Sequence, residues 1–143
     1  CIRDRLETLI KDCGLYKSKA KNLIATCQIL VEQYHGEVPR EFDQLVELPG
    51  VGRKTANVVV SVLFGTPAIA VDTHVFRVSN RLKLGIAKTP EEMEQKLQKA
   101  IPKKDWAAAH HWLIYHGRRV CKARKPLCNE CFLNHLCPSA GKV

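Results

Sequence analysis

The chain has 143 residues, 45% of them hydrophobic, which is enough for one sizeable core or two small ones. It contains no apolar run near the roughly 18 residues of a membrane span, so we expect no membrane association. The net charge of +9 is uneven, because residues 1–98 carry 14 basic and 12 acidic residues while residues 99–143 carry 9 and 2. This concentration of positive charge in the last third favours a polyanionic partner over a surface that is merely basic.

Apolar residues recur every three to four positions along most of the chain, which is the period of amphipathic helices. The seven prolines fall between these segments and mark the connections. Thr89 and Pro90 have the residue types of a helix start. Only residues 66–71 are a candidate for an extended segment, and they have no second strand to pair with. We therefore predict an all-α fold, with apolar helical faces at residues 2–10, 20–31, 56–64, 75–82, 93–101 and 106–113.

A glycine-containing turn stands between a short predicted helix at residues 41–48 and a longer one that begins at Arg53. Gly50 and Gly52 permit a positive φ and let the backbone approach a partner closely. The free N–H groups at the start of the second helix then face an anion, for which a nucleic-acid phosphate is the natural candidate in a basic protein. On the glycines alone, a tight turn that binds nothing is an equally good interpretation.

Two residues that follow this turn carry side chains able to take part in catalysis. Lys54 lies in the first turn of the predicted helix, where the helix dipole disfavours its positive charge and so favours the nucleophilic neutral amine. Asp72 precedes a predicted helix start and suits an N-cap, whose hydrogen bonds lower the pKa of the carboxyl group and keep it ionised. A capping carboxylate held this rigidly is also able to stabilise a developing cation or carry a proton.

Four of the seven cysteines, Cys121, Cys128, Cys131 and Cys137, lie within 17 residues. This odd total with one tight cluster argues against a secreted disulfide framework and favours a metal centre in a reducing compartment. Spacing alone leaves zinc and iron–sulfur open. Lys122, Arg124 and Lys125 in the same loop suit phosphate binding, or form a merely solvated basic loop. We expect the other cysteines to be buried or neutral thiols, and His110, His111 and His116 to be packed rather than metal-bound.

Two motifs resemble those of one protein family. LPGVGRKTAN at residues 48–57 and AVDTHVFRVSNR at residues 70–81 are similar to the two signatures of the endonuclease III family of helix-hairpin-helix DNA glycosylases. The cysteine spacing also resembles that family, in which four such cysteines hold a [4Fe-4S] cluster. The resemblance implies that fold, with a partial helical-barrel domain at residues 1–66 and a cluster-bearing helical domain at residues 67–143.

The same resemblance implies site residues. Lys54 corresponds to the family's nucleophile and Asp72 to its catalytic carboxylate, and Cys121, Cys128, Cys131 and Cys137 correspond to the cluster ligands. The expected DNA contacts are Gly50, Val51, Gly52, Arg53, Thr55, His74, Arg77, Lys122, Arg124 and Lys125.

The implied function is a bifunctional DNA glycosylase and abasic-site lyase of base excision repair that removes oxidised pyrimidines. Its partner would be double-stranded DNA with damaged bases or abasic sites, bound by a monomer inside the cell (in a bacterium, in the nucleoid-containing cytoplasm). One alternative is an adenine-removing relative, although such relatives usually lack lysine at position 54. The other is a non-catalytic iron–sulfur DNA-binding module, since complete family members have further N-terminal helices.

Overall fold

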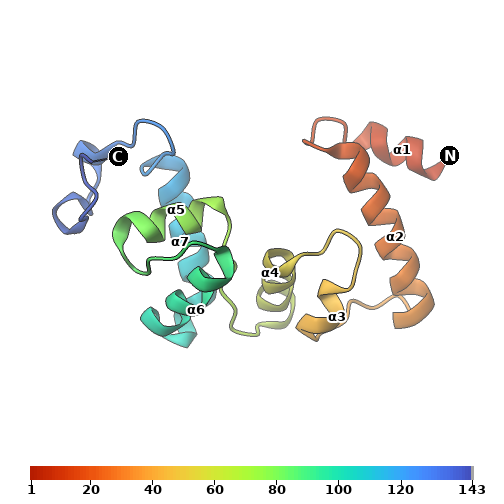
Figure 1. Cartoon of the computed structure of the whole chain (residues 1–143). Helices are drawn as coiled ribbons and strands as arrows, with labels where there is room; N and C mark the ends of the chain where they lie inside the picture. The colour runs from red at the N-terminus through yellow and green to blue at the C-terminus, as the bar shows by residue number, and fades with distance from the viewer. Residues whose placement is uncertain (143) are drawn as a thin grey trace. The chain divides into compact units, whose positions relative to one another are not determined.

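The computed structural model describes residues 1–142, which form helices joined by turns and loops and include no strand (Figure 1). The predicted all-α fold is therefore confirmed. None of the helices in these residues combines the length and apolar character needed to cross a bilayer. The α-helices are α1 (Ile2–Leu9), α2 (Tyr16–Tyr34), α3 (Phe42–Val46), α4 (Arg53–Phe64), α5 (Thr73–Leu82), α6 (Pro90–Ala100) and α7 (Trp106–Arg119), and the 3-10 helices are η1 (Lys103–Asp105), η2 (Cys128–Glu130) and η3 (Asn134–Leu136).

The chain divides into two compact units, an N-terminal unit of residues Cys1–Ala56 and a C-terminal unit from Asn57 onward. The domain boundary at residues 66 and 67 that the family resemblance implies remains a prediction. Residues 65–72 form neither a helix nor a paired strand, in agreement with the prediction of an unpaired extended segment there.

In the N-terminal unit, α1 and α2 pack against each other but leave much of their apolar surface uncovered. No residue of α1 is buried, and Ala20 is the one buried residue of α2. The two helices line a groove of about 580 Å³ between Ile2 and Leu6 on one side and Leu23, Ile24 and Val31 on the other. The predicted apolar faces thus exist, but they form an exposed groove rather than a closed core.

The turn between α3 and α4 is packed against α2. Leu45 and Leu48 are buried beneath it, and the Thr26 hydroxyl of α2 donates a hydrogen bond to the Pro49 carbonyl at 3.0 Å. Helix α3 is shorter than the helix predicted over residues 41–48, because the chain already turns with a hydrogen bond from Leu48 N–H to the Leu45 carbonyl. These contacts fix the turn that precedes Lys54.

The C-terminal unit has a core formed mainly by α5, α6 and α7. Figure 1 shows α5 alongside α7, and these two helices form the most extensive helix pair of the described chain. Burying each large aliphatic side chain here stabilises the unit by roughly 1.5–3 kcal/mol. The buried core residues are Ile69, Val71, Val75, Val78, Met93, Leu97, Ala109 and Leu113.

The two glycines of the turn should respond differently to substitution. Gly50 has a φ of +76°, and an added Cβ would lie 2.4 Å from the Asn22 side-chain nitrogen, whereas a Cβ at Gly52 would meet nothing within 4 Å. Gly50→Ala should therefore lower the free energy of unfolding by about 1–2 kcal/mol or more, while Gly52→Ala should change it by less than about 0.5 kcal/mol. Urea unfolding of both variants measures the difference, and equal stability would contradict the role assigned to Gly50.

Candidate functional site

The helix-hairpin-helix turn presents backbone donors at the start of α4. Gly52 accepts the first hydrogen bond of the helix, from Ala56 N–H at 3.0 Å, so the N–H groups of the preceding residues have no partner within the helix. Gly50 and Gly52 are exposed, and so are Arg53 and Thr55. These N–H groups and the helix dipole provide the anion-binding features expected from the sequence.

Arg53 packs against the helix that precedes the turn. Its guanidinium carbon lies 5.1 Å from the centre of the Phe42 ring, so the cation rests on the aromatic side chain at the start of α3. Val51, also predicted to contact DNA, is half-buried, and its N–H donates to the Leu48 carbonyl at 3.0 Å. Val51 and Arg53 thus help hold the turn, while their DNA contacts remain predictions.

Lys54 is exposed in the first turn of α4, where the sequence places it. It belongs to the N-terminal unit, whereas Asp72 belongs to the C-terminal unit. The exposure of Lys54 meets one need of an amine nucleophile, which is access to a partner.

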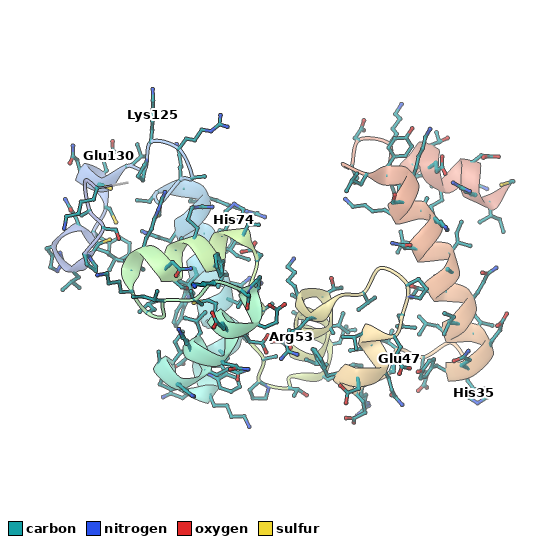
Figure 2. All side chains as sticks on the ribbon, in the orientation of Figure 1. His35, Glu47, Arg53, His74, Lys125 and Glu130 are labelled. Atoms are coloured by element: carbon teal, nitrogen blue, oxygen red, sulfur yellow. The ribbon has the colours of Figure 1, made fainter. Side chains whose placement is uncertain are left out.

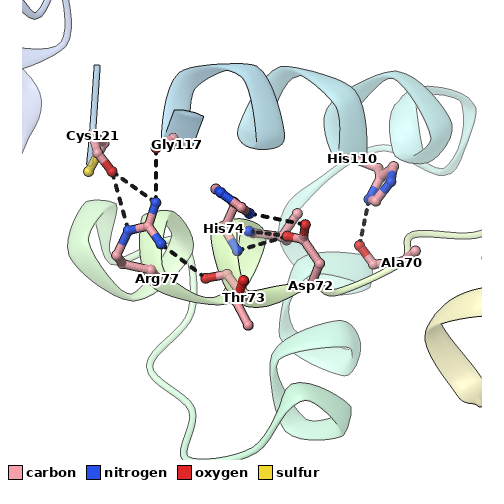
Figure 3. A network of polar contacts seen from close by, with 9 residues as sticks. Ala70, Asp72, Thr73, His74, Arg77, His110, Gly117 and Cys121 are labelled. Atoms are coloured by element: carbon pink, nitrogen blue, oxygen red, sulfur yellow. Dashed lines mark hydrogen bonds and ion pairs between the residues drawn. The ribbon is translucent and has the colours of Figure 1, made fainter. Parts of the chain in front are cut away.

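Asp72 is the N-cap of α5, as predicted. Its Oδ1 atom accepts hydrogen bonds from the N–H groups of His74 and Val75, both at 2.8 Å, while Oδ2 lies 3.3 Å from His74 Nδ1 (Figure 3). Burial alone raises the pKa of this carboxyl group, but the bonds from Val75 and His74 and the charge of His74 outweigh it, so the net pKa is lowered. The carboxylate is therefore ionised at neutral pH and fixed in place.

Arg77 is bound to protein carbonyls. Its guanidinium donates to Gly117 O at 2.9 Å, to Cys121 O at 3.1 and 3.2 Å, and to Thr73 O at 3.5 Å (Figure 3). These bonds join α5 to the end of α7 and to the first cysteine of the loop. This is a structural position that the sequence did not reveal, and the DNA contact predicted for Arg77 remains untested.

The four clustered cysteines are half-buried and all line one pocket. Arg81 and His116 line it too, with Arg81 Nη1 3.4 Å from Cys121 Sγ and His116 Nε2 3.8 Å from Cys131 Sγ. In residues 1–142, no three His, Cys, Asp or Glu side chains are grouped to coordinate a single metal ion. A four-iron cluster does not require such a group, because each cysteine then binds a different iron. The four cysteine side chains line one pocket, with the Arg81 guanidinium and the His116 ring beside two of the sulfurs. This arrangement fits an iron–sulfur cluster.

Arg81 and His116 lie near the cysteines, and the sequence analysis assigned neither of them a role there. Burial lowers the pKa of the His116 ring, which also packs edge-on against the Phe132 ring at 5.8 Å between centres. The sequence offers two signals for Arg81: it ends the motif at residues 70–81, and its spacing of four residues from Arg77 places both on one face of a helix.

The cations of the cysteine loop point to solvent. Lys122, Arg124 and Lys125 are exposed, and Figure 2 shows the Lys125 side chain projecting from the loop. Lys125 has a φ of 52°, which lies in the left-handed region. A loop with three exposed cations suits phosphate binding, as predicted from the sequence.

Among the predictions for the remaining histidines and cysteines, one is confirmed and the others differ from the structure. His110 is buried and its Nδ1 lies 2.7 Å from the Ala70 carbonyl, in agreement with a packed histidine (Figure 3). His111 is exposed, so its expected packing is wrong: it lies on the outer face of α7. The thiols of Cys1, Cys13 and Cys27 are also exposed rather than buried, because the helices α1 and α2 and the turn between them leave these positions uncovered.

Comparison with known proteins identifies the family to which the chain belongs. Residues 3–103 match the family described as HhH-GPD superfamily base excision DNA repair protein, and residues 121–137 match the iron–sulfur binding domain of endonuclease III. The chain therefore belongs to the HhH-GPD superfamily of base excision DNA repair proteins. The second match, over the four cysteines, identifies the cofactor as a [4Fe-4S] cluster rather than zinc.

Individual relatives confirm the resemblance to endonuclease III. The chain is 54% identical to Endonuclease III of Escherichia coli (strain K12) over 96% of its own length and 65% of that protein, and 54% identical to the Bacillus subtilis (strain 168) protein over 97% and 64%. It thus spans somewhat less than two thirds of these relatives. A solved structure described as a non-covalent Endonuclease III–DNA complex matches with a TM-score of 0.92 and 52% identity, over 98% of this chain and 66% of that one.

Chemical analysis of the purified protein checks the cofactor. We expect about four iron atoms and four acid-labile sulfides per chain, with no zinc in stoichiometric amount. Replacing Cys128 by serine should lower the iron content, whereas the matched change Cys13→Ser, at a thiol remote in sequence from the loop, should leave it unchanged. One tightly bound zinc per chain without sulfide would contradict the assignment.

Asp72 should show a pH-dependent contribution to stability. A carboxyl group whose pKa is lowered by folding stabilises the protein at pH values above its ordinary pKa of 3.8. This stabilisation is lost as the pH falls through the lowered pKa of the folded protein. Asn also caps helices well, so Asp72→Asn should lose mainly the part of the unfolding free energy that depends on the charge. The difference in unfolding free energy between this variant and the wild type should therefore vanish in acid. Asp72→Ala should cost about 1 kcal/mol more at neutral pH. Urea unfolding from pH 7 to pH 2 tests this, and a deficit of Asp72→Asn that grows in acid would contradict it.

Proposed function

We propose that this chain acts as a bifunctional DNA glycosylase and abasic-site lyase of base excision repair, with DNA that contains oxidised pyrimidines as its substrate. The observation that carries the proposal is an exposed lysine, Lys54, in the first turn of α4, directly after the glycine turn. One relative in particular supports covalent chemistry: a structure described as a trapped Endonuclease III–DNA covalent intermediate matches with a TM-score of 0.92 and 52% identity, over 98% of this chain and 66% of that chain.

The turn and the basic loop would bind the DNA backbone. The N–H groups at the start of α4 would bind a phosphate, and Lys122, Arg124 and Lys125 would add attraction that weakens with salt. Such backbone contacts position the duplex without reading its sequence. The target nucleotide is then turned out of the duplex, which is easier for a damaged base than for a paired one.

Lys54 would carry the covalent step. Its neutral amine forms a bond to C1′ of the nucleotide as the bond from C1′ to the base breaks, and the base leaves with the electron pair and takes up a proton. Opening of the sugar ring gives a Schiff base between Lys54 and C1′. Loss of a proton from C2′ then expels the 3′ phosphate, which cuts the strand.

Asp72 would act on charge and protons. Because its carboxylate is ionised and held by two backbone N–H groups, it is able to stabilise positive charge that develops on the sugar without reorganising. As an ionised carboxylate it would also accept a proton during the reaction. The [4Fe-4S] cluster, held by the four cysteines, would organise the basic loop rather than take part in these steps.

The two alternatives gain no support from the comparisons. Another match, described as a thermostable thymine-DNA glycosylase, is 27% identical with a TM-score of 0.83, so it indicates a shared fold rather than a shared substrate. We also propose that the protein works as a monomer inside the cell, as the resemblance implies.

Borohydride trapping tests the proposal. With duplex DNA that contains an abasic site, the full-length protein should form a covalent adduct when borohydride reduces the Schiff base. Lys54→Ala should abolish the adduct, because no other amine replaces the nucleophile, whereas Lys99→Ala, which removes the same charge from an exposed position on α6, should retain it. The adduct is measured by its slower migration in a denaturing gel.

Three outcomes would overturn the assignment. An adduct that persists in Lys54→Ala would place the nucleophile elsewhere. Absence of any adduct from the folded, cluster-containing wild type would favour the binding module. Excision of adenine opposite 8-oxoguanine with little strand cleavage would instead favour the adenine-removing relative.

A further inference from the structure

Helix α5 places a second arginine against the cysteine loop, one turn beyond Arg77. The Arg81 guanidinium contacts three consecutive residues: Nη1 donates to Cys121 Sγ at 3.4 Å and to Lys122 O at 2.7 Å, and Nη2 donates to Ala123 O at 3.1 Å. These are the first cysteine and the first two residues of the basic segment. A single side chain therefore holds both the sulfur and the main chain at the start of the loop.

The far end of the loop reaches the same residue. The thiol sulfur of Cys137, the last of the four cysteines, lies 3.8 Å from the Arg81 carbonyl oxygen. Arg81 thus touches the loop at both ends, although these ends are 16 positions apart in the sequence. Because α5 is anchored by buried Val75 and Val78, the contact point is a rigid one.

The chemistry of this contact suits a thiolate. An arginine side chain is always protonated, and its planar fork holds two terminal nitrogens in a fixed geometry that the single ammonium nitrogen of lysine does not reproduce. The Arg81 guanidinium is placed to keep its hydrogen bond to Cys121 Sγ when this sulfur binds iron. Donors and charge near the sulfurs of a cluster also influence its reduction potential.

We propose that Arg81 is the positioning residue of the cluster loop. It holds the Cys121 thiolate in place for iron and, through the carbonyls of Lys122 and Ala123, fixes the start of the segment that carries the exposed cations Lys122, Arg124 and Lys125. The proposal rests on the [4Fe-4S] cofactor and not on the glycosylase and lyase activity, so trapping experiments on Lys54 and experiments on Arg81 succeed or fail separately.

The first test is iron retention in the cluster-loaded, full-length protein. Loss of a hydrogen-bonded charge should make Arg81→Gln release iron to a chelator about tenfold faster than the wild type. Arg81→Lys, which keeps the charge and loses the fork, should fall between them. Arg119→Gln is the matched control, because Arg119 is exposed on α7 and rests on the Tyr115 ring. The loss of cluster absorbance over time gives the rates.

The second test separates a contact with sulfur from general support of the fold. Removing a cation and an N–H group from beside a cluster ligand disfavours the more negative, reduced cluster, so Arg81→Gln should shift the reduction potential to more negative values. Arg119→Gln should not. If Arg81→Gln fails to fold, Arg81→Lys serves for both measurements. Wild-type iron release together with an unshifted potential in the Arg81 variant would overturn the proposal.

Discussion

The orientation of helix α5 is the constraint on which the C-terminal unit depends. Val75 and Val78 on one side of this ten-residue helix are completely buried, so the helix is unable to rotate about its axis without exposing them. With the rotation fixed, Asp72 stands at the N-terminus, and Arg77 and Arg81 face the end of α7 and the cysteine loop. The apolar core therefore determines where the charged groups point, and it does so through residues that take no part in the chemistry.

Five cations in and beside the cysteine loop fall into two groups with different uses. Arg77 and Arg81 are half-buried and bound to main-chain carbonyls, where they shape the chain. Lys122, Arg124 and Lys125 are exposed and supply the positive field that a phosphate backbone would meet. The groups are linked, since the Lys122 carbonyl accepts a bond from Arg81 while its ammonium remains in solvent. A high positive charge is thus compatible with an ordered loop, because the inward cations are bound by the polar main chain.

The sequence predicted local features well because local rules govern them. Asp72 and Thr89 cap their helices as their residue types indicate, and α4 begins at Arg53 after the glycine turn. The partners of Arg77 and Arg81 lie about 40 residues further along the chain, and no local pattern tells whether a cation bonds to a carbonyl or meets solvent. Likewise, periodicity predicted the apolar faces of α1 and α2 but not that they line an exposed groove, because the partner of an apolar face is a tertiary property.

The two oxygens of the Asp72 carboxylate divide its work between folding and chemistry. Both capping bonds end on Oδ1, so the helix start is satisfied by one oxygen, while Oδ2 faces the ring of His74. Capping and the proposed proton transfer would compete if they needed the same lone pairs, but the capping bonds leave Oδ2 for the proposed transfer. The ionised form also serves both purposes, since it is the better acceptor for backbone N–H groups and the only form that stabilises a cation. A residue placed at a helix start for structural reasons is for this reason already prepared for the catalytic step proposed for it, and its burial beside His74 keeps the second oxygen directed rather than freely solvated.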